Sequence, residues 1–501
     1  MLTSYWQHFK SGTDIRGVAL DGVEDQPLDL TDEVVEKLAA AFARWLSGKT
    51  GKPAAALTVS LGRDSRLSGP RLRDAVVRSL TARGVTVLDC GLASTPAMFM
   101  TTVDLGCDGA VQLTASHHPY HRNGLKFFLP SGGLEGTDIT ALLELAQAED
   151  FPPPAAGTVR EIAYMTQYAA RLRRLICEGV QAEDYNRPLA GFRIVVDAGN
   201  GAGGFYARDV LEPLGADVSG SQFLEPDGRF PNHIPNPENP EAMASVCAAT
   251  LKAGADLGVI FDTDVDRAGC VGADGREINR NRLIALAAAI VLEDAPGGTI
   301  VTDSVTSSGL KTFLEQTLGV HCRFKRGYKN VINEAQRLCA SGVNAPLAIE
   351  TSGHAALKDN YFLDDGAYLV TRIIIKAAQL RREGRTLEDL IAALEEPAES
   401  VELRFNILES DFKAYGLQVL ERLEAYARRQ GWPVAEDSRE GVRTTVGDGW
   451  LLLRLSVHDP VMPLNIESAA PGGCRAIASA LTDFMSAEGG LDKSQLDAYL
   501  S

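Results

Sequence analysis

Short apolar runs alternate with helix-like patterns over most of this chain, and this alternation limits the folds that it can adopt. Apolar runs at 56–61, 85–88 and 109–113 have the length of buried strands, and helical periodicity lies between them. A helix capped by Thr31 precedes them, and its apolar residues share one face: Val34, Leu38, Phe42 and Trp45. Strands that alternate with helices are typical of α/β domains.

The same alternation continues beyond residue 190, with strand-like runs at 192–197, 256–261, 299–302 and 347–349. The pattern changes after a helix-like run at 387–394, where two strand-like runs and two helix patterns follow. This last part is typical of a smaller α+β domain. We therefore predict three α/β units and one α+β unit, without a repeat at the level of sequence.

The length of 501 residues also requires several hydrophobic cores, roughly three or four at ~150 residues per domain. The segment 149–157 contains consecutive prolines, which break both helices and strand ladders, so it is a candidate linker. The predicted domains are 1–155, 156–275, 276–394 and 395–501.

The charge balance limits the partners. The chain has 49 Lys and Arg against 66 Asp and Glu, a net charge of −17, which disfavours nucleic acid and anionic membranes as partners. No secretory signal pattern is present, and apolar stretches such as 283–292 are too short to span a bilayer. The eight cysteines lie scattered without a C-x-x-C pair, as is typical of reduced thiols. We expect a cytoplasmic protein without a zinc site.

The strongest local feature is the segment 108–128. An apolar strand runs into Ser116, at a position where α/β folds usually hold ligands. Lys126 returns beside Ser116 if the segment forms a hairpin, and it would then assist a phosphorylated serine or deprotonate a substrate hydroxyl. A polar turn that only caps the strand is the alternative. His117 and His118 are adjacent and cannot share a face, so they do not predict a metal site.

The second feature is a group of three carboxylates after the strand at 256–261. Alternation by two places Asp262, Asp264 and Asp266 on one side of an extended loop. Carboxylates so close together repel unless a hard cation neutralises them, and oxygen ligands favour Mg²⁺ over zinc. A solvated acidic turn is the alternative, although it fits poorly after a buried strand. Arg267 adds a cation at the rim that suits a phosphate.

Two other chemistries have partial signals. The turn 199–204 satisfies G-x-G-x-x-G after a strand, and Asp217 lies at about the distance of a ribose-binding acid. A nicotinamide-dependent oxidoreductase is therefore an alternative, although nothing else in the chain supplies hydride chemistry. A phosphatase with a D-x-D-x-T loop is a second alternative. Here Asp266 replaces the Thr of that loop, and the phosphatase mechanism would leave Ser116 without a role.

Two further loops carry ligand-binding side chains. The first offers a carboxylate, a hydroxyl and an imidazole that can bind sugar hydroxyls, namely Glu350, Ser352 and His354. The second ends a strand with Arg454 and Ser456, which suits a phosphate. Structural roles remain open for both loops, because isolated polar residues in turns are often structural.

These four loops, in this order, resemble those of the α-D-phosphohexomutase superfamily, which includes phosphoglucomutase, phosphomannomutase and phosphoglucosamine mutase. T-A-S-H-H-P at 114–119 and D-T-D-V-D-R at 262–267 form a specific pair. Further matches are S-G-T-D-I-R-G at 11–17, G-R-D-S-R at 62–66 and the proline-rich 230–238. The resemblance implies three similar α/β domains with mixed sheets around a central cleft, plus a smaller C-terminal α+β domain.

The resemblance also implies roles for individual residues. Ser116 would be the phosphoserine, with His117 as a further catalytic residue and Arg16 and Lys126 as the acid–base pair. The phosphoserine with Asp262, Asp264 and Asp266 would hold Mg²⁺. Substrate-binding residues would be Arg267, Glu350, Ser352, His354, Arg454 and Ser456. The implied reaction interconverts hexose 1-phosphate and hexose 6-phosphate through a 1,6-bisphosphate, which also serves as activator. The implied partners are small sugar phosphates, and the chain would be a monomer or homodimer.

The distal phosphate loop departs from the family pattern R-x-S-G-T-E-P-x-x-R. Arg454 and Ser456 match, but the Gly and Thr are absent and Pro463 stands where the last Arg belongs. Three residues are candidates to compensate: His458, Asn465 and Arg475. His354 and T-A-S-H-H-P favour a glucose or mannose phosphate as substrate, with phosphoglucosamine mutase as the alternative. Tyr328 replaces the His of some phosphomannomutase/phosphoglucomutases.

Overall fold

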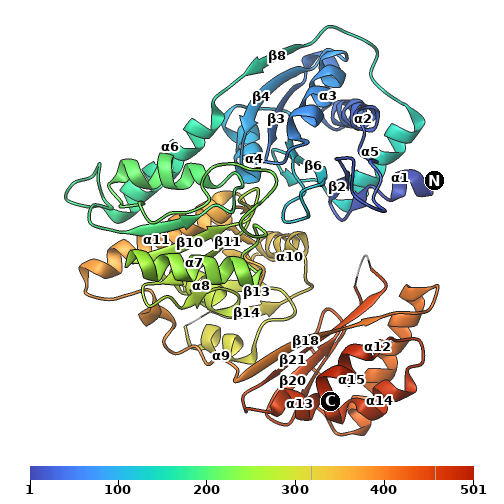
Figure 1. The fold of residues 1–501 in the computed structure, drawn as a ribbon, viewed down its shortest axis with the longest axis vertical. Coiled ribbons are helices and arrows are strands. Elements are labelled where there is room, and N and C mark those ends of the chain that lie inside the picture. The colour runs from blue at the N-terminus through green and yellow to red at the C-terminus, as the bar shows by residue number, and fades with distance from the viewer. Residues whose placement is uncertain (318, 457–458) are drawn as a thin grey trace. The chain divides into compact units, whose positions relative to one another are not determined.

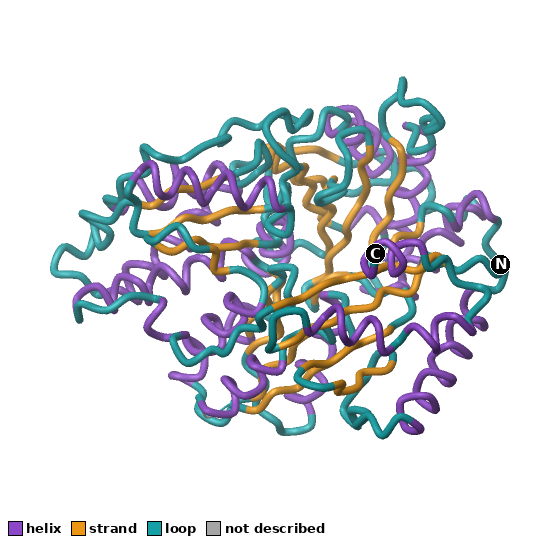
Figure 2. The backbone as a smooth tube through the Cα atoms, turned by 60° about the horizontal axis from the view of Figure 1, so that its bottom comes forward, coloured by secondary structure: helices purple, strands orange, loops and turns teal. Residues whose placement is uncertain are grey.

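The computed structural model describes residues 1–317, 319–456 and 459–501. The chain forms two compact units. The first consists of residues 1–283 and 352–389, and the second of residues 284–351 and 390–501. Figure 1 labels the elements along the chain, and Figure 2 shows the strands in orange and the helices in purple. Among the described residues, no helix has both the length and the apolar character needed to cross a membrane.

The first unit opens with a mixed sheet in the order β1-β2-β6-β5-β3-β4-β8, with β7 beside β6. Strands β5, β3, β4 and β8 are parallel, with β8 at the edge of the sheet, whereas β6, β2 and β1 run antiparallel to their neighbours. The strands are β1 (Lys10–Ser11), β2 (Asp14–Val18), β3 (Thr58–Arg63), β4 (Thr86–Leu92), β5 (Gly109–Leu113), β6 (Arg122–Leu129), β7 (Gly132–Gly133) and β8 (Thr158–Glu161).

Five helices accompany this sheet: α1 (Ser4–Gln7), α2 (Asp32–Thr50), α3 (Gly69–Thr81), α4 (Thr95–Asp104) and α5 (Gly136–Ala148). The predicted cap of α2 is confirmed, because Thr31 Oγ1 accepts the Val34 amide at 3.3 Å. Apolar residues of α2, α3 and α5 share one core with the sheet. A short 3₁₀ turn, η1 (Ala54–Ala56), leads into β3.

Strand β8 extends the first sheet past residue 155, where the sequence suggested a boundary. It pairs in parallel with β4 from Thr86↔Thr158 to Asp89↔Glu161. All its residues are exposed, so no apolar run marks it in the sequence. The proline-rich segment before it therefore connects α5, a helix beside the first sheet, to β8, a strand of that sheet.

A second sheet in the first unit has the order β12-β11-β10-β9. Its strands are β9 (Ile194–Asp197), β10 (Leu257–Phe261), β11 (Ala268–Gly272) and β12 (Glu277–Ile278). The helical segments around it are α6 (Tyr164–Val180), the π-helix η2 (Tyr206–Leu211), η3 (Glu212–Leu214) and α7 (Pro240–Ala253). The apolar residues of α7 pack on β9, β10 and β11.

Residues 352–389 complete the first unit. They contain the antiparallel pair β16 (Ala355–Leu357) and β17 (Leu363–Asp364), with η4 (Lys358–Asn360) between, and α11 (Gly366–Arg382), which packs against α6. The helix expected at 387–394 is only one 3₁₀ turn, η5 (Glu388–Ile391). Helix nucleation is unfavourable, and a segment this short has few propagating residues to offset it.

The second unit begins with parallel strands β13 (Thr299–Thr302), β14 (Val320–Arg323) and β15 (Leu347–Ile349). The helices here are α8 (Asn281–Asp294), which starts in the first unit, α9 (Ser308–Gln316) and α10 (Tyr328–Ala340). The expected strands at 299–302 and 347–349 are thereby confirmed.

The C-terminal part is an antiparallel sheet in the order β18-β21-β20-β19, packed against helices. The strands are β18 (Glu399–Asn406), β19 (Val442–Val446), β20 (Gly449–Leu453) and β21 (Val461–Ser468), and the helices are α12 (Phe412–Arg429), α13 (Gly473–Ala480), α14 (Thr482–Ala487) and α15 (Ser494–Leu500). The predicted fold class, α/β units with mixed sheets followed by a smaller α+β part, is confirmed.

Candidate active site

Ser116 follows β5 in the loop that leads to β6, and it is buried. Its backbone φ is +50°, an uncommon value for a residue other than glycine. The Ser116 amide donates to Thr114 Oγ1 at 2.9 Å, which holds this turn. Ser116 Oγ donates to Asp262 Oδ2 at 3.1 Å and accepts from Arg267 Nη2 at 2.8 Å. The hydroxyl therefore lies between a carboxylate and a guanidinium, away from bulk water.

The hairpin that would bring Lys126 back to this region is present. Strands β5 and β6 pair antiparallel with Gln112 opposite Lys126. Lys126 Nζ donates to Asp264 Oδ2 at 3.0 Å and also to Asp266 Oδ2. Lys126 therefore neutralises part of the charge on the carboxylate loop that follows β10.

A single buried guanidinium, that of Arg66, organises the Ser116 loop. Arg66 is only 1% exposed. Its nitrogens donate to the backbone carbonyls of Ser116, His118, Pro119 and Arg122. Asp64 accepts from Arg66 Nε at 3.2 Å and from Thr114 Oγ1 at 2.7 Å, so it ties Arg66 to the same loop. The sequence shows the G-R-D-S-R motif but not its target, because the bonds reach a loop 50 residues further along.

A loop from the second sheet region covers Arg66. The Phe230 ring centroid lies 5.3 Å from the Arg66 guanidinium carbon. A Cβ on Gly228 would lie 2.7 Å from Arg66 Cα and 2.4 Å from the Ser65 carbonyl, so only glycine allows this approach. Burial raises the pKa of Asp64 to about 6, although Arg66 opposes the shift. The loop that carries Phe230 thus encloses the ion pair of Asp64 and Arg66.

The three carboxylates lie on the loop between β10 and β11. Val265, in the middle of this loop, has a φ of +68°, which is strained for a β-branched residue. The Arg267 amide donates to Asp262 Oδ1 at 3.2 Å and closes the loop. Oxygens of Asp262, Asp264 and Asp266 lie within 4.8 Å of one another, so the expected clustering is present.

The cluster suits a divalent cation. Asp264 Oδ1 and Asp266 Oδ1 are buried and have no hydrogen-bond partner among the described residues. Buried carboxylate oxygens without donors are unfavourable, and the three carboxylates outnumber the lysine and the arginine that contact them, Lys126 and Arg267. A set of oxygen ligands with surplus negative charge fits Mg²⁺.

The pKa values of the carboxylates differ within the cluster. Burial, reinforced by Asp266 and Asp264, raises the pKa of Asp262 well above its usual range. Burial acts in the same direction on Asp266, but the positive charges of Lys126, His354 and Arg267 together lower its pKa. The loop therefore holds its negative charge unevenly, with the most favourable ionisation beside Lys126.

Thr95, the first residue of α4, also contacts the carboxylate loop. Its Oγ1 donates to Asp264 Oδ2 at 2.5 Å, and its amide donates to the Asp264 carbonyl at 2.8 Å. The N-terminus of α4 thus meets a carboxylate, which the helix dipole favours. Ser94, Thr95 and Pro96 form a typical helix start in the sequence. The sequence could not show that Thr95 bonds Asp264, because the two lie 169 residues apart.

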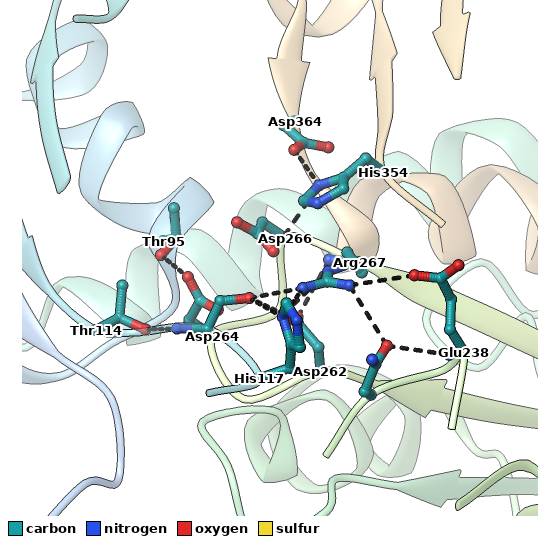
Figure 3. Close-up of polar contacts among 12 residues, drawn as sticks. Thr95, Thr114, His117, Glu238, Asp262, Asp264, Asp266, Arg267, His354 and Asp364 are labelled. Atoms are coloured by element: carbon teal, nitrogen blue, oxygen red, sulfur yellow. Dashed lines mark hydrogen bonds and ion pairs between the residues drawn. The ribbon is translucent and has the colours of Figure 1, made fainter. Parts of the chain in front are cut away.

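The sequence predicted Arg267 at the rim of the site, but this prediction is wrong, because Arg267 is only 4% exposed. Figure 3 shows its guanidinium among Asp262, Glu238 and His117, and the Arg267 nitrogens lie 3.5 Å from Asp262 Oδ2 and 3.8 Å from Glu238 Oε2. The His117 Nδ1 contacts Arg267 and lies 3.2 Å from Ser116 Oγ. Burial, followed by the charge of Arg267, lowers the pKa of His117 to about 2, so this imidazole is neutral near pH 7.

His354, whose side chain is 13% exposed, pairs with the buried Asp364, a residue that the sequence alone did not single out. His354 Nδ1 contacts Asp364 Oδ2 and lies 4.0 Å from Asp266 Oδ1 (Figure 3). Burial disfavours the imidazolium, but the charges of Asp364 and Asp266 outweigh it and raise the pKa of His354. A protonated His354 can donate to a sugar oxygen. The role of Asp364 depends on the β16–β17 pair, which places it opposite Ala356 and lets it accept the Ala355 amide.

Arg16 lies on β2, directly opposite Gly124 of β6. A Cβ on Gly124 would lie 2.2 Å from the Ile15 carbonyl, so the glycine allows the close approach of β2 and β6 beside Arg16. Arg16 Nη2 donates to Asp14 Oδ2 at 2.9 Å, and Arg16 Nε is buried without a partner in the described part of the chain. Burial and then the charge of Arg16 lower the pKa of His118 to about 3.

The sugar-loop candidates Glu350 and Ser352 are both buried. Glu350 belongs to the second unit, where its Oε1 accepts the Gly327 amide at 2.6 Å. Ser352 and His354 belong to the first unit. The loop that the sequence assigned to sugar binding therefore contributes residues to both units.

The distal-loop candidates lie in the second unit. Arg454 is 8% exposed, and the Ser456 amide donates to the Val461 carbonyl at 2.9 Å. Of the three candidates for compensation, Arg475 donates to the carbonyls of Tyr499 and Leu500 and so is bound to the C-terminal helix. Asn465 Nδ2 donates to Glu402 Oε2 at 3.0 Å. His458 falls outside the described residues.

The glycine-rich turn 199–204 has a packing role. Four of its amides are engaged within the protein, since Gly199 donates to Asp197, Asn200 to Phe223, Gly201 to Ala198 and Ala202 to Thr263. A Cβ on Gly201 would lie 2.6 Å from the Thr263 carbonyl. These amides are therefore not available to a pyrophosphate, and the turn instead lets the carboxylate loop approach closely.

Comparison with known proteins identifies the family. Residues 9–152, 168–275 and 279–397 match the three families described as "Phosphoglucomutase/phosphomannomutase, alpha/beta/alpha" domains I, II and III. The phosphomannomutase/phosphoglucomutase of Pseudomonas putida is 31% identical over 445 residues, or 88% of this chain and 90% of that protein. The phosphoglucomutase/phosphomannomutase of Thermococcus kodakarensis is 31% identical over 91% of this chain and 93% of that protein.

Solved structures agree. A phosphoglucomutase/phosphomannomutase family protein from Burkholderia thailandensis has a TM-score of 0.80 at 28% identity and covers 98% of this chain and 99% of its own. The N-acetylphosphoglucosamine mutase of Aspergillus fumigatus, in complex with GlcNAc-6P and magnesium, has a TM-score of 0.52 at 14% identity, covers 90% of this chain and 96% of its own, and shows the fold alone. With its three matched domains and these relatives, the chain belongs to the α-D-phosphohexomutase superfamily, whose phosphomannomutase and phosphoglucomutase members are isomerases of hexose phosphates.

Proposed function

We propose that this chain interconverts the 1- and 6-phosphates of glucose, of mannose or of both, through a phosphorylated Ser116 and a hexose 1,6-bisphosphate. The observation that carries the proposal is the position of Ser116 Oγ between Asp262 and Arg267, beside a carboxylate cluster with oxygens that no described donor reaches. Phosphoryl transfer depends chiefly on positioning and on neutralising charge, and this arrangement supplies both.

The residues at Ser116 divide the work. Arg267 donates to Ser116 Oγ and would follow the transferring phosphoryl oxygens, while His117, as a neutral acceptor, orients the Arg267 fork. Asp262, Asp264 and Asp266, with the phosphoserine, would hold Mg²⁺, which when bound neutralises negative charge on the phosphoryl group.

The proposed cycle conserves phosphate. A free hydroxyl of the hexose phosphate attacks phosphorus, the bond from phosphorus to Ser116 Oγ breaks, and the hydroxyl proton ends on Ser116 Oγ. In the acid–base pair that the resemblance implies, only Lys126 can relay this proton, in its neutral amine form, while Arg16 stays a cation. The product is a 1,6-bisphosphate. Its other phosphate then returns to Ser116 Oγ, which leaves the isomeric monophosphate. External bisphosphate acts as activator because it restores phosphoserine on enzyme that has lost its phosphate.

Substrate binding requires two more groups of residues. Glu350, Ser352 and His354 would bind sugar hydroxyls, and Arg454 and Ser456 would hold the phosphate that is not reacting. This second phosphate site is mandatory in the mechanism, because either end of the sugar must be held while the other reacts. The predicted domain boundaries, the cytoplasmic location and a monomeric or homodimeric state remain predictions.

The test is an isomerase assay on glucose 1-phosphate and mannose 1-phosphate with catalytic bisphosphate. The unaltered enzyme should isomerise at least one, and Ser116→Ala should remove the activity. Ser65→Ala is the matched control, because Ser65 Oγ is also buried and has no partner among the described residues. Full activity in Ser116→Ala would contradict the mechanism, and a preference for glucosamine phosphate would assign the chain as a phosphoglucosamine mutase. Binding of a nicotinamide cofactor at millimolar concentration would revive the oxidoreductase alternative.

A further inference from the structure

Three strands of the C-terminal sheet place two arginines on either side of Pro463. Arg404 on β18 pairs with Pro463 on β21, and on the other side the Arg454 amide, just after β20, donates to the Pro463 carbonyl at 3.1 Å. Residues directly opposite one another in an antiparallel pair project from the same face, with Cβ atoms about 4.5–5.5 Å apart. The three residues, called here the clamp row, therefore present two guanidinium groups with a proline between them.

The position of Pro463 gives the clamp row its significance. In the family pattern of the distal phosphate loop, an arginine stands at this position, and here a proline without charge replaces it. Arg404 lies directly across the strand pair from that position. A positive charge missing from β21 is thus present on the neighbouring strand, on the same face of the sheet.

A third arginine joins the clamp row through two carboxylates. Glu440 Oε1 lies 3.8 Å from Arg454 Nη1, and Glu440 Oε2 accepts the Arg326 amide at 3.1 Å. Glu402 Oε2 lies 3.9 Å from Arg326 Nη1, and Glu402 Oε1 accepts from Arg404 Nη2 at 2.7 Å. The order is therefore arginine, glutamate, arginine, glutamate, arginine, with one positive charge in excess.

An unused donor suits this cluster to an anion, and Asn465 supports the cluster without binding the ligand itself. Arg454 is 8% exposed, and its Nε is buried with no hydrogen-bond partner in the described ranges, which leaves a donor unused. Asn465, the candidate for compensation on β21, donates to Glu402 Oε2 at 3.0 Å. Asn465 therefore positions a carboxylate that holds Arg404 and does not itself need to bind the ligand.

We propose that Arg404 and Arg326 complete the distal phosphate site with Arg454, and that Arg404 takes the part of the arginine absent at position 463. The ligand is the phosphate monoester dianion of the hexose phosphate, at the end of the sugar that is not reacting. Glu402 and Glu440 orient the guanidinium forks, which bind phosphate oxygens in pairs. This inference rests on the proposed function, since it assigns the substrate-holding part of that site.

The test compares Arg404→Ala with the unaltered enzyme in steady-state kinetics on whichever sugar phosphate is turned over. Loss of a charged donor pair should raise KM about tenfold with kcat within about threefold, because the clamp holds substrate equally in ground and transition states. The KM of Arg404→Lys should lie between those of the unaltered enzyme and Arg404→Ala, because lysine keeps the positive charge but cannot offer two parallel donors. Arg428→Ala is the control, as Arg428 is an exposed arginine of α12 paired with Glu424, and its KM should not change.

A rescue variant makes the assignment specific. Adding Pro463→Arg to Arg404→Ala returns the charge to β21 and should bring KM to within about threefold of the unaltered value. Circular dichroism establishes that each variant is folded. If Arg404→Ala does not fold, Arg404→Gln takes its place in every comparison. A KM for Arg404→Ala within about twofold of the unaltered enzyme would overturn the inference. A double variant whose KM stays as high as that of Arg404→Ala would overturn it as well.

The same variants separate this inference from the proposed function. If the unaltered enzyme isomerises a hexose phosphate but Arg404→Ala leaves KM unchanged, the clamp assignment is wrong while the function stands. If no hexose phosphate is isomerised, the proposed function fails. Calorimetry with inorganic phosphate then decides the site alone: weaker binding by Arg404→Ala supports it, and equal binding overturns it.

Discussion

The buried group around Ser116 in the first unit and the clamp row of the second unit differ in how far their charges are exposed. Around Ser116, the carboxylates and Arg267 are at most 4% exposed, and each side chain contacts another member of the group. In the clamp row, the Arg454 side chain is also buried, at 10% exposed, but the Arg404 side chain is 59% exposed, and that of its partner Glu402 is 28% exposed. The first site matches the family pattern, whereas the second departs from it.

This contrast indicates how freely a charge can be relocated. A buried charge loses several kcal/mol of stabilisation when its partner is removed, so every member of the Ser116 network depends on the others. An exposed cation remains solvated without a partner and needs only to lie near the phosphate. A binding charge at the surface can therefore move across a strand pair from 463 to 404, whereas Asp264 or Arg267 cannot be moved in this way.

The strongest effect that separates the two regions is expected at the carboxylates. Asp264→Asn keeps the size of the side chain but removes a charge that the metal needs, so activity should fall at least about a thousandfold and Mg²⁺ binding should weaken in calorimetry. Chelation of Mg²⁺ from the unaltered enzyme should have the same effect, reversed by adding Mg²⁺. Asp74→Asn, at a half-exposed aspartate paired with Arg73, is the control. Activity of Asp264→Asn within about tenfold of the unaltered enzyme would contradict the assignment.

A smaller but diagnostic effect is expected at Arg66, which acts through the Ser116 loop and is a positioning residue. Arg66→Lys keeps the charge but cannot bind four carbonyls, so Ser116 should shift and kcat should fall about a hundredfold, with KM within about threefold. Steady-state kinetics measure this split between kcat and KM. Arg63→Lys is the matched control, because Arg63 belongs to the same motif but donates to the Asp64 carbonyl at 3.4 Å. An equal loss of kcat in both variants would show that the carbonyl bonds of Arg66 are not the cause.

The clamp row should tolerate a change that the buried site would not. Pro463→Arg alone should alter KM by less than about threefold, because Arg404 already supplies the charge at this place. Kinetics with the same sugar phosphate measure it. A decrease in KM of about tenfold would show that the charge at 463 had not been replaced.

The weakest effect is expected on stability, at the ion pair of His233 and Asp197. His233, on the loop that carries Phe230, contacts both Asp197 oxygens at 3.1 and 3.0 Å. Burial opposes protonation, but the Asp197 carboxylate outweighs it and raises the pKa of His233. The pair therefore stabilises the fold fully when the pH is below the pKa of His233 in the unfolded chain, about 6.5. This stabilisation is lost as the pH rises through the higher pKa that His233 has in the folded protein. His233→Gln should lower Tm below about pH 6 by on the order of 1 °C, and by less at about pH 8. A loss of Tm that grows with pH would contradict this sign.

The sequence predicts the elements well where a strand is buried or a helix is amphipathic. The strands at 109–113 and 299–302 have the predicted bounds, whereas exposed β8 carries no apolar run. Motifs also located residues that the structure brings together, because Ser116 and the carboxylates each follow a strand. The sequence could not show that Arg66 binds the Ser116 loop, that Asp364 pairs with His354, or that Arg404 faces Pro463. These contacts depend on strand register and on loops far apart in sequence.

The decisive measurement is whether Ser116 carries the phosphoryl group during turnover. Mass spectrometry of enzyme incubated with glucose 1,6-bisphosphate should show one phosphoryl group, on the peptide that contains Ser116, and adding hexose monophosphate should transfer it to the sugar. Ser116→Ala should gain none. Isomerase activity in enzyme that never carries phosphate at Ser116 would contradict the phosphoserine mechanism.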